Sequence, residues 1–398
     1  MADWTLIALD TPAAGSGQRT ELSMASGRSM EFSLDSTDTL SFSLPGRHWQ
    51  TTVIEPLTTD ILVYRDDYCA QRFRVTGMDI NKESESLKCS FTAVSYRELM
   101  NAWMFLPNHT RRFLDLEQTD IAWTILNESQ VLPKGGIGMT RGTYPFVPVN
   151  RTLDGDWEAT TPDPYYYEVG KRKGDAVQDI AAMVSGFEWD IEPDRTSSAT
   201  ERTGMKFNTW NTGLRQQHTP RCPFVLDDGG NITSWSRQSA PSEFANVIHA
   251  LGHYPEGVGT ADDPPPFAWA PPDMNPGGAA PEGRWERSVS TDAMSQDGID
   301  AAAASELERS LAYQPAWSVR LAKGRWQGPP EMWIGDTCRL IVNDGPIDVD
   351  ADARVVTLKI DVTDDGSEDI GIDLDRPART YDQFRADLER RILDLEHR

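Results

Sequence analysis

Three aspartates at alternate positions, Asp348, Asp350 and Asp352, form the acidic cluster of this chain that comes nearest to a metal-binding motif. A calcium loop that starts with such a triplet needs glycine at its sixth position for a sharp turn and a bidentate glutamate at its twelfth. Ala353 and Lys359 occupy those two positions. The sequence therefore predicts no calcium site here.

Two histidines, His249 and His253, have the four-residue spacing of a helical zinc pair. The motif also needs a glutamate directly after the first histidine, where the chain has Ala250, and Gly252 interrupts the segment. In an extended strand the two side chains would share a face but lie about 13 Å apart, too far for one ion. We assign no metal ligand, and zinc is the weaker interpretation.

Other reactive residues show no catalytic arrangement. The glycines form no phosphate-binding loop, and no nucleophile elbow or Cys/His pair with an orienting group is present. The four cysteines are widely spaced and are expected to be reduced and largely buried: Cys69, Cys89, Cys222 and Cys338. We expect no enzyme activity, no catalytic residue and no cofactor.

Aromatic residues suggest a second kind of site, because aromatic faces stack on sugar rings. Trp103, Trp123, Trp157 and Trp189, with the triplet Tyr165–Tyr167, are the candidates. Large aromatic side chains more often anchor cores and subunit interfaces, and no polar set converges on these residues in the sequence. The core and interface interpretation is favoured.

The net charge of the chain is strongly negative. Its 398 residues carry a formal charge of −24, with 38% hydrophobic residues. A nucleic-acid surface needs clustered Lys and Arg to displace counterions from phosphates, so specific DNA binding is not expected. No run of eighteen apolar residues could span a bilayer, and the N-terminus lacks the pattern of a signal peptide. We expect synthesis in the bacterial cytoplasm.

Alternating apolar residues predict paired strands in the first hundred residues. Ser95 and Glu98 can form a capping box for a helix that runs to Met104. Together these elements predict a small antiparallel barrel closed by a helix. The predicted strands are 29–35, 39–46, 59–67, 71–77 and 87–94, with Asp66-Asp67 as a turn.

Further along, helical patterns alternate with strand patterns. Asp300 is positioned to cap the last of the predicted helices. Asp365-Gly366 predicts a hairpin turn with Ile360, Val362, Ile370 and Ile372 alternating on its arms, and Asp227–Gly230 resembles it. The predicted helices are 117–130, 175–184 and 300–311, and strands are expected at 187–191 and from 317 to 374.

The stretch from Gly252 to Glu286 is rich in proline and glycine, which excludes a helix and a central strand. We expect a long loop, and an arm that wraps a neighbouring subunit would explain its composition.

The last segment, 380–398, has the pattern of an amphipathic helix. Its apolar face could pack on the same chain, associate around a three-fold axis, or dock onto the next protein of an assembly. The interface candidates are Tyr381, Phe384, Leu388, Ile392 and Leu395.

The order of several stretches resembles the tail-hub proteins (minor tail or baseplate hub proteins) of long-tailed phages of actinobacteria. The similarity lies in residues 56–66, 72–77 and 96–100, in the helix-to-strand corner Gly186–Trp189, and in the closing segments 335–340 and 353–362. No single stretch is specific, so the resemblance depends on their order.

The resemblance implies an α+β, β-rich fold in which two small antiparallel β-barrels flank an α/β middle region. The expected parts are an N-terminal barrel with its closing helix (1–106), a middle domain with an insertion (107–250), a Pro/Gly-rich arm (251–299), a second barrel (300–377) and a C-terminal helix (378–398).

It also implies a structural role in the virion. The chain would form a homotrimer that joins the six-fold tail tube to the tail-tip or fibre proteins and leaves a channel for the genome. Genomic DNA would pass without specific binding, although the surplus acids could equally serve solubility. The alternative is a virion-associated carbohydrate-active protein, either a glycosidase with two carboxylates or a glycan-binding module.

Overall fold

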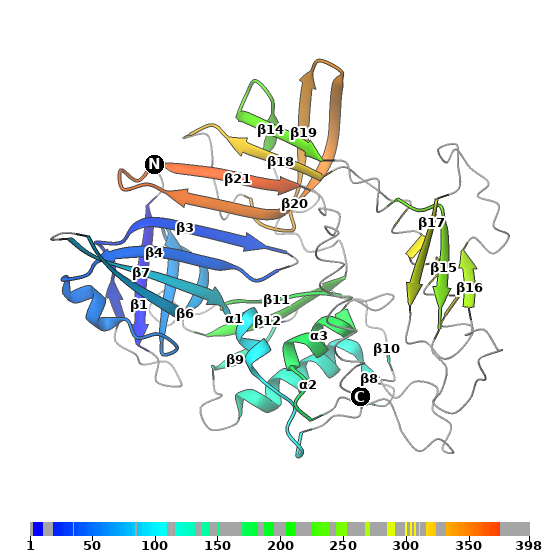
Figure 1. Cartoon of the computed structure of the whole chain (residues 1–398), viewed down its shortest axis with the longest axis horizontal. Helices are drawn as coiled ribbons and strands as arrows, with labels where there is room; N and C mark the ends of the chain where they lie inside the picture. Colours follow the sequence, from blue (N-terminus) through cyan, green and yellow to red (C-terminus); the bar gives the residue numbers. More distant parts are fainter. Residues whose placement is uncertain are drawn as a thin grey trace. The chain divides into compact units, whose positions relative to one another are not determined.

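The computed structural model gives a β-rich chain (Figure 1). The residues that it describes are 3–10, 19–34, 36–83, 86–109, 113, 116–131, 137–142, 150–151, 169–181, 187–194, 204–211, 224–238, 244–252, 267–270, 285–290, 299–300, 303–304, 306–307, 310, 316–323 and 332–374. They group into two compact units. The first unit comprises 1–151, 167–236 and 318–374, and the second comprises 152–166, 237–317 and 375–398.

The N-terminal strands of the first unit agree with the alternation in the sequence. The inward-facing residues Met30, Phe32, Leu40 and Phe42 are all buried, because every second side chain of a strand points to one face. The strands are β1 (Trp4–Asp10), β2 (Arg19–Glu21), β3 (Ser26–Ser33), β4 (Thr39–Pro45), β5 (Thr59–Arg65), β6 (Tyr68–Glu83) and β7 (Ser86–Ser95).

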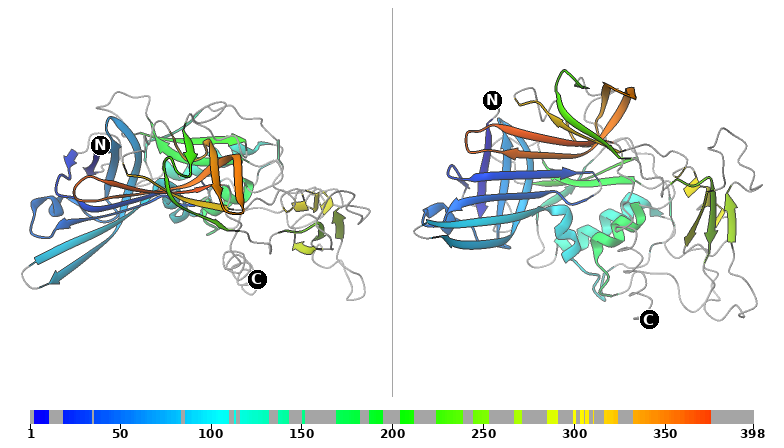
Figure 2. Two further views of the ribbon diagram at one scale, coloured as in Figure 1. Left: turned by 90° about the horizontal axis from the view of Figure 1, so that it is seen from above. Right: turned by 45° about the horizontal axis from the view of Figure 1, so that its top comes forward.

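Strands from the C-terminal part continue the same sheet. Residues 357–362 of β20 pair with β3, so segments more than three hundred residues apart in sequence are neighbours in both views of Figure 2. The order is β14-β18-β21-β20-β3-β4-β7-β6-β5-β1-β2, with β19 joining β20 and β13. These strands are β13 (Val225–Asp227), β14 (Ile232–Gln238), β18 (Ala316–Leu321), β19 (Thr337–Asp344), β20 (Ile347–Val362) and β21 (Glu368–Leu374).

This topology corrects the expectation of two separate barrels. In the described part of the chain the path of paired strands ends at β14 and at β2, which do not pair with each other, so no closed barrel forms. The reason is that β3 uses one edge for β4 and the other for β20. The outer edge of the N-terminal strand group therefore pairs with a C-terminal strand, and the group does not close on itself.

Helices and small sheets of the middle region also belong to the first unit. Helix α2 (Gln118–Gln130) begins where predicted, and the Glu117 carboxylate caps it by accepting from the N–H groups of Thr119 and Asp120. Helix α3 (Lys173–Ala181) follows. A three-stranded sheet has the order β11-β12-β9 and a two-stranded sheet pairs β8 with β10. Their bounds are β8 (Leu116–Glu117), β9 (Met139–Arg141), β10 (Asn150–Arg151), β11 (Phe187–Pro193) and β12 (Met205–Asn211).

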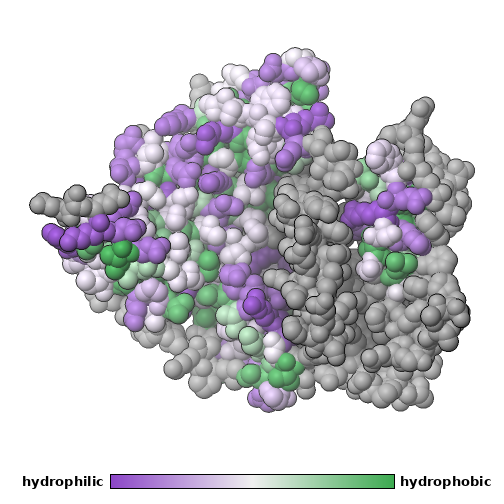
Figure 3. All heavy atoms as spheres, in the orientation of Figure 1, coloured by the Kyte–Doolittle hydropathy of each residue, from purple (hydrophilic) through white to green (hydrophobic). Residues whose placement is uncertain are grey.

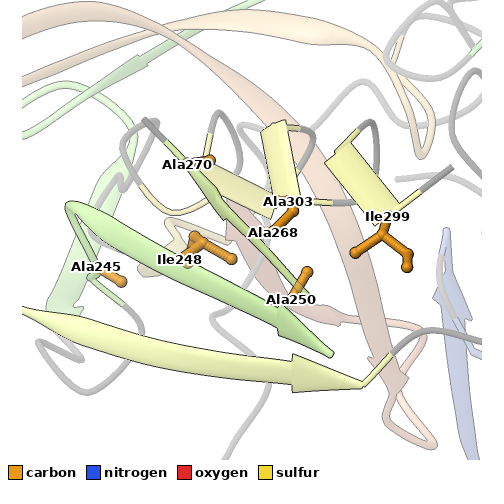
Figure 4. Close-up of a cluster of buried hydrophobic side chains, with 7 residues drawn as sticks. All are labelled: Ala245, Ile248, Ala250, Ala268, Ala270, Ile299 and Ala303. Carbon is orange, nitrogen blue, oxygen red and sulfur yellow. The ribbon is translucent and has the colours of Figure 1, made fainter. Parts of the chain in front are cut away.

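The second unit contains a three-stranded sheet of order β16-β15-β17, formed by β15 (Val247–Leu251), β16 (Phe267–Ala270) and β17 (Glu286–Ser290). Small apolar residues pack against helical residues 299 and 303 (Figure 4). The buried set is Ala245, Ile248, Ala250, Ala268, Ala270, Ile299 and Ala303. Strand β16 lies inside the stretch expected to be a loop; it is an edge strand, the sheet position that tolerates neighbouring prolines.

Several local expectations need correction. The helix after β7 is short, with α1 (Tyr96–Leu99) followed by the 3-10 turn η2 (Met100–Ala102), and the Ser95 side chain makes no capping hydrogen bond. Asp300 is itself helical and follows helical Ile299, so it is not the N-cap. Residues 227–230 form a turn but not a hairpin, because β13 pairs with β19 and β14 pairs with β18.

Candidate functional site

The sequence-predicted interface residues cannot be placed. Tyr381, Phe384, Leu388, Ile392 and Leu395 all lie outside the described residues, as do Trp157, the tyrosine triplet, Cys222 and His253. The C-terminal helix therefore stays a prediction. The other three cysteines, Cys69, Cys89 and Cys338, are buried as expected.

The reactive residues that the structure does place form no metal site. Asp348, Asp350 and Asp352 lie along β20, and Asp350 accepts two hydrogen bonds from Arg339 at 2.6 and 2.5 Å. His249 lies in the middle strand of the second unit, opposite Trp269 and Ser288. In the part of the chain that the structure describes, no three His, Cys, Asp or Glu side chains are grouped to hold an ion.

A shallow depression of about 280 Å³ crosses β14, β18 and β21. Three of its polar side chains are already engaged: Arg320 is paired with Asp369 at 3.0 Å, and Ser318 donates to Asp373. The Trp235 ring nitrogen donates to Asp228 at 2.9 Å. Arg320, Ser318 and Trp235 are thus committed to partners within the protein.

A buried charge network lies between β5, β6 and α1. The Asp60 carboxylate is fully buried and accepts hydrogen bonds from Arg72 Nε at 2.7 Å and from the Tyr96 hydroxyl at 2.6 Å. Arg74 also binds Asp60, and its Nη2 donates to the Tyr96 hydroxyl at 2.9 Å. Burial, followed by the Asp60 charge, raises the pKa of Tyr96 well above its usual value, so the hydroxyl keeps its proton.

The network fixes an unusual turn at residues 55–58. Arg74 Nη1 donates to the Leu57 carbonyl at 2.8 Å, and the Leu57 N–H donates to the Val75 carbonyl at 2.7 Å. Leu57 has φ of 68°, and Pro56 precedes it, as in a type II turn whose third position normally holds glycine. The side chain is 66% exposed. A strained backbone thus displays an apolar side chain that adds little to the core.

Just beyond this turn, β6 contains a bulge. Val75 pairs with Ala93 and Gly77 pairs with Thr92, so Thr76 is the additional residue. A Cβ on Gly77 would lie 2.5 Å from the Thr92 hydroxyl oxygen, so a larger residue there would force the Thr92 side chain to turn away. The bulge shifts the alternation by one residue. Met78 and Ile80 consequently share the face of buried Phe91, not the polar face.

The outer half of β6 extends past the core. Met78 is 40% exposed and Ile80 is 57% exposed, although their cross-strand partners Phe91 and Cys89 are buried. The end of the β6–β7 hairpin projects beyond neighbouring strands in Figure 2, and apolar and polar spheres meet at the corresponding end of the surface in Figure 3. The apolar strip of the core therefore continues onto the surface.

One edge of this outer half has no neighbouring strand among the described residues. Strand β5 pairs with β6 only up to Arg74, and β7 occupies the opposite edge. The N–H of Gly46, directly after β4, donates to the Leu87 carbonyl at 2.7 Å. The backbone groups of Leu87 therefore point toward β4, and those of the next residue, Lys88, point toward β6. Because residues alternate in direction, Asp79 and Asn81 bond to β7, whereas Met78, Ile80 and Lys82 turn their N–H and C=O groups outward.

A second buried charge lies between α2 and α3. The Lys173 side chain is fully buried; its Nζ donates to the Ile125 carbonyl at 2.5 Å and lies 3.7 Å from Glu128. Burial lowers the pKa of Lys173 to about 8. The pKa of His109 is lowered as well, first by burial of the imidazole and second by the positive charge of Lys173. This cluster stabilises helix packing and faces no cleft in the described residues.

Sequence reasoning located β6 and β7 but did not single out the open edge. The available signal was Thr76-Gly77 inside a strand pattern, which is typical of a bulge, followed by apolar Met78 and Ile80. The deciding information is the absence of a β5 residue opposite Gly77–Glu83, and this depends on where β5 begins after the turn at Leu57.

Comparisons with known proteins give similarity at the level of structure alone. No family model and no curated protein sequence matches the chain. A tail protein from Neisseria meningitidis MC58 superposes with a TM-score of 0.63 at 9% identity, covering 94% of this chain and 96% of that one.

Two prophage proteins are also similar over nearly their whole lengths. The 43 kDa tail protein of prophage MuSo2 from Shewanella oneidensis has a TM-score of 0.58 at 12% identity, covering 94% of this chain and 98% of that one. A prophage tail protein from Listeria monocytogenes EGD-e has a TM-score of 0.54 at 10% identity, covering 94% and 95%. The chain therefore has the fold of these tail proteins.

Proposed function

We propose that this chain is a structural subunit of a phage tail tip, a hub protein that joins the tail tube to the distal tip. The observation that carries the proposal is the whole-length similarity to three tail proteins, which spans 94% of this chain. Folds can host several functions, but here the similarity covers both chains almost completely.

The proposed assembly is a three-fold ring. Each chain contributes an N-terminal and a C-terminal strand group, joined where β20 pairs with β3. Three copies would present six strand groups to a six-fold tube. On the opposite side the ring contacts tail-tip or fibre proteins. The protein is made in the host cytoplasm and resides in the virion.

The charge of −24 supports a channel through which DNA passes without binding. A net negative charge repels phosphates, so little affinity is gained from counterion release. The role is structural and not enzymatic. None of the helices in the described part of the chain has the length and apolar character that a membrane crossing requires.

Native mass spectrometry of the purified chain, with class averages from electron microscopy, tests the proposal. We expect three copies per particle and three-fold averages with a central channel. A glycan-hydrolysis assay on purified cell wall is the control for the carbohydrate-active alternative. A monomer that cleaves glycan would contradict the proposed function.

A further inference from the structure

We propose that the outer half of β6, residues 77–83, is a docking edge for an extended strand of a different tail protein, a segment of positive net charge with alternating apolar and polar side chains. The inference rests on the proposed function for the identity of the assembly. The edge itself follows from the fold.

The backbone supplies the first part of the argument. Met78, Ile80 and Lys82 present N–H and C=O groups on the side away from β7, and no described strand pairs with them. A row of such groups is a template for an added strand, because the new strand forms a regular ladder of hydrogen bonds. Natural sheets usually protect such an edge with charge, proline or a covering element.

The side chains supply the second part. Met78 and Ile80 are 40% and 57% exposed on the face that holds buried Phe91. An edge that must stay unpaired would carry charged residues on this face, but charge appears there only at Lys82. The bulge at Thr76 is what places these two apolar residues on the core face. A strand added beside β6 would extend the apolar face and cover them.

The turn at Leu57 defines the inner end of the edge. The Leu57 N–H occupies the Val75 carbonyl, so an incoming strand can pair only from Gly77 outward. Leu57 is 66% exposed at this point and is held there by Arg74. An incoming segment therefore meets a fixed apolar side chain at one end of its ladder, which sets the register.

A second copy of this chain does not fit the edge. Each copy carries a charge of −24, so a segment of positive net charge is attracted to it. In the described part of the chain, the first half of β20 pairs with β19 alone, but its Asp348 and Asp352 would face the polar side of β6 at Asp79, where like charges oppose. Pairing one short strand also buries much less than the roughly 1,200 Å² of a stable dimer. A basic segment of another protein avoids the opposition of like charges.

The test uses the full-length chain and a labelled eight-residue peptide of alternating Val and Lys as the probe, at 0.3 M salt to suppress non-specific attraction. The control peptide has the same charge but carries proline at a central Val, which prevents strand pairing. Ile80→Pro removes one outward N–H and leaves the bonds of Asp79 and Asn81 to β7. Ile80→Val keeps that N–H and is the matched control.

We expect the Val-Lys peptide to bind the unmodified chain and Ile80→Val within about twofold, and Ile80→Pro at least about tenfold more weakly. Amide exchange should show Met78, Ile80 and Lys82 exchanging fast in the isolated chain and slowly with peptide, while Asp79 and Asn81 are protected in both. Should Ile80→Pro fail to fold, this exchange pattern in the unmodified chain decides the question.

Equal binding of the two peptides, or an unchanged exchange pattern, would overturn the proposal. A dimer of the unmodified chain that is lost in the Ile80→Pro variant would also overturn it, because a second copy would then be the strand that pairs with the edge. These outcomes leave the three-fold ring untouched, since the ring is judged by native mass and class averages. Conversely, loss of the ring would not alter peptide binding to the edge.

Discussion

Arg354 and Glu188 form a two-pronged ion pair, in which Nη1 and Nη2 of the arginine donate to the two carboxylate oxygens at 2.8 and 2.7 Å. Arg354 belongs to β20 of the large sheet and Glu188 to β11 of the three-stranded sheet. Their side chains are 15% and 8% exposed. The pair therefore connects the C-terminal strands to the middle region inside the first unit.

Breaking this pair should destabilise the first unit strongly. Arg354→Met removes two hydrogen bonds from the buried Glu188 carboxylate, and we expect the free energy of unfolding to fall by about 3 kcal/mol in urea denaturation. The double variant Arg354→Met with Glu188→Leu should recover most of this loss, because the buried carboxylate is removed as well. A double variant as unstable as the single one would show that the pair's geometry, and not charge burial, decides stability.

Local pattern predicted most of the strands because both ends of the chain have a clear two-residue alternation. Ile360, Val362, Ile370 and Ile372 are all buried on the predicted hairpin, and β21 ends at Leu374 as expected. Similarly, α2 begins after Glu117, whose carboxylate caps it. In these elements the apolar period and the turn chemistry agree.

Strand partners were not predictable in the same way. Nothing in Ser29–Ser33 indicates that its neighbour is Thr357–Asp361 instead of a strand from its own group, because both candidates carry the same alternation. Pairing between distant segments depends on the whole arrangement, and this is why barrels were expected where a continuous sheet forms. The open edge at Ile80 depends on the same information.

The Lys173 ammonium should make stability depend on pH between about 8 and 10.5. Its pKa in the folded chain is about 8, below the ordinary 10.5, so the unfolded chain binds more protons in this window. Stability should therefore rise with pH, by on the order of 1 kcal/mol, and then level off.

The measurement is urea denaturation at pH 7.5 to 10, compared with Lys173→Met, whose profile should lack this rise. Above pH 10 the raised pKa of Tyr96 acts in the opposite direction, because the folded chain then holds a proton that the unfolded chain releases. If the unmodified chain and Lys173→Met gave parallel profiles of stability against pH, the pKa of Lys173 in the folded chain would be the ordinary one.

Leu57→Gly should leave stability unchanged or raise it by up to about 1 kcal/mol. The leucine at φ of 68° costs about 1–2 kcal/mol, which glycine avoids, while glycine adds disorder to the unfolded chain. Leu57→Ala is the matched control, because it keeps the strained Cβ and removes only the exposed atoms. Urea denaturation that shows Leu57→Gly less stable than Leu57→Ala would mean that this turn is not strained.

Removal of residues 379–398 tests whether the C-terminal segment mediates assembly. If its apolar stripe is an interface, the truncated chain should keep the thermal unfolding profile of the first unit but form few three-fold particles by native mass spectrometry. Phe384→Asp with Leu388→Asp should reproduce the defect within the full-length chain, because two charges enter the apolar stripe. Gln383→Ala lies off the stripe and should assemble normally. Full assembly by the truncated chain would reject three-fold association through this segment and leave packing against the same chain or docking onto the next tail protein to explain the stripe.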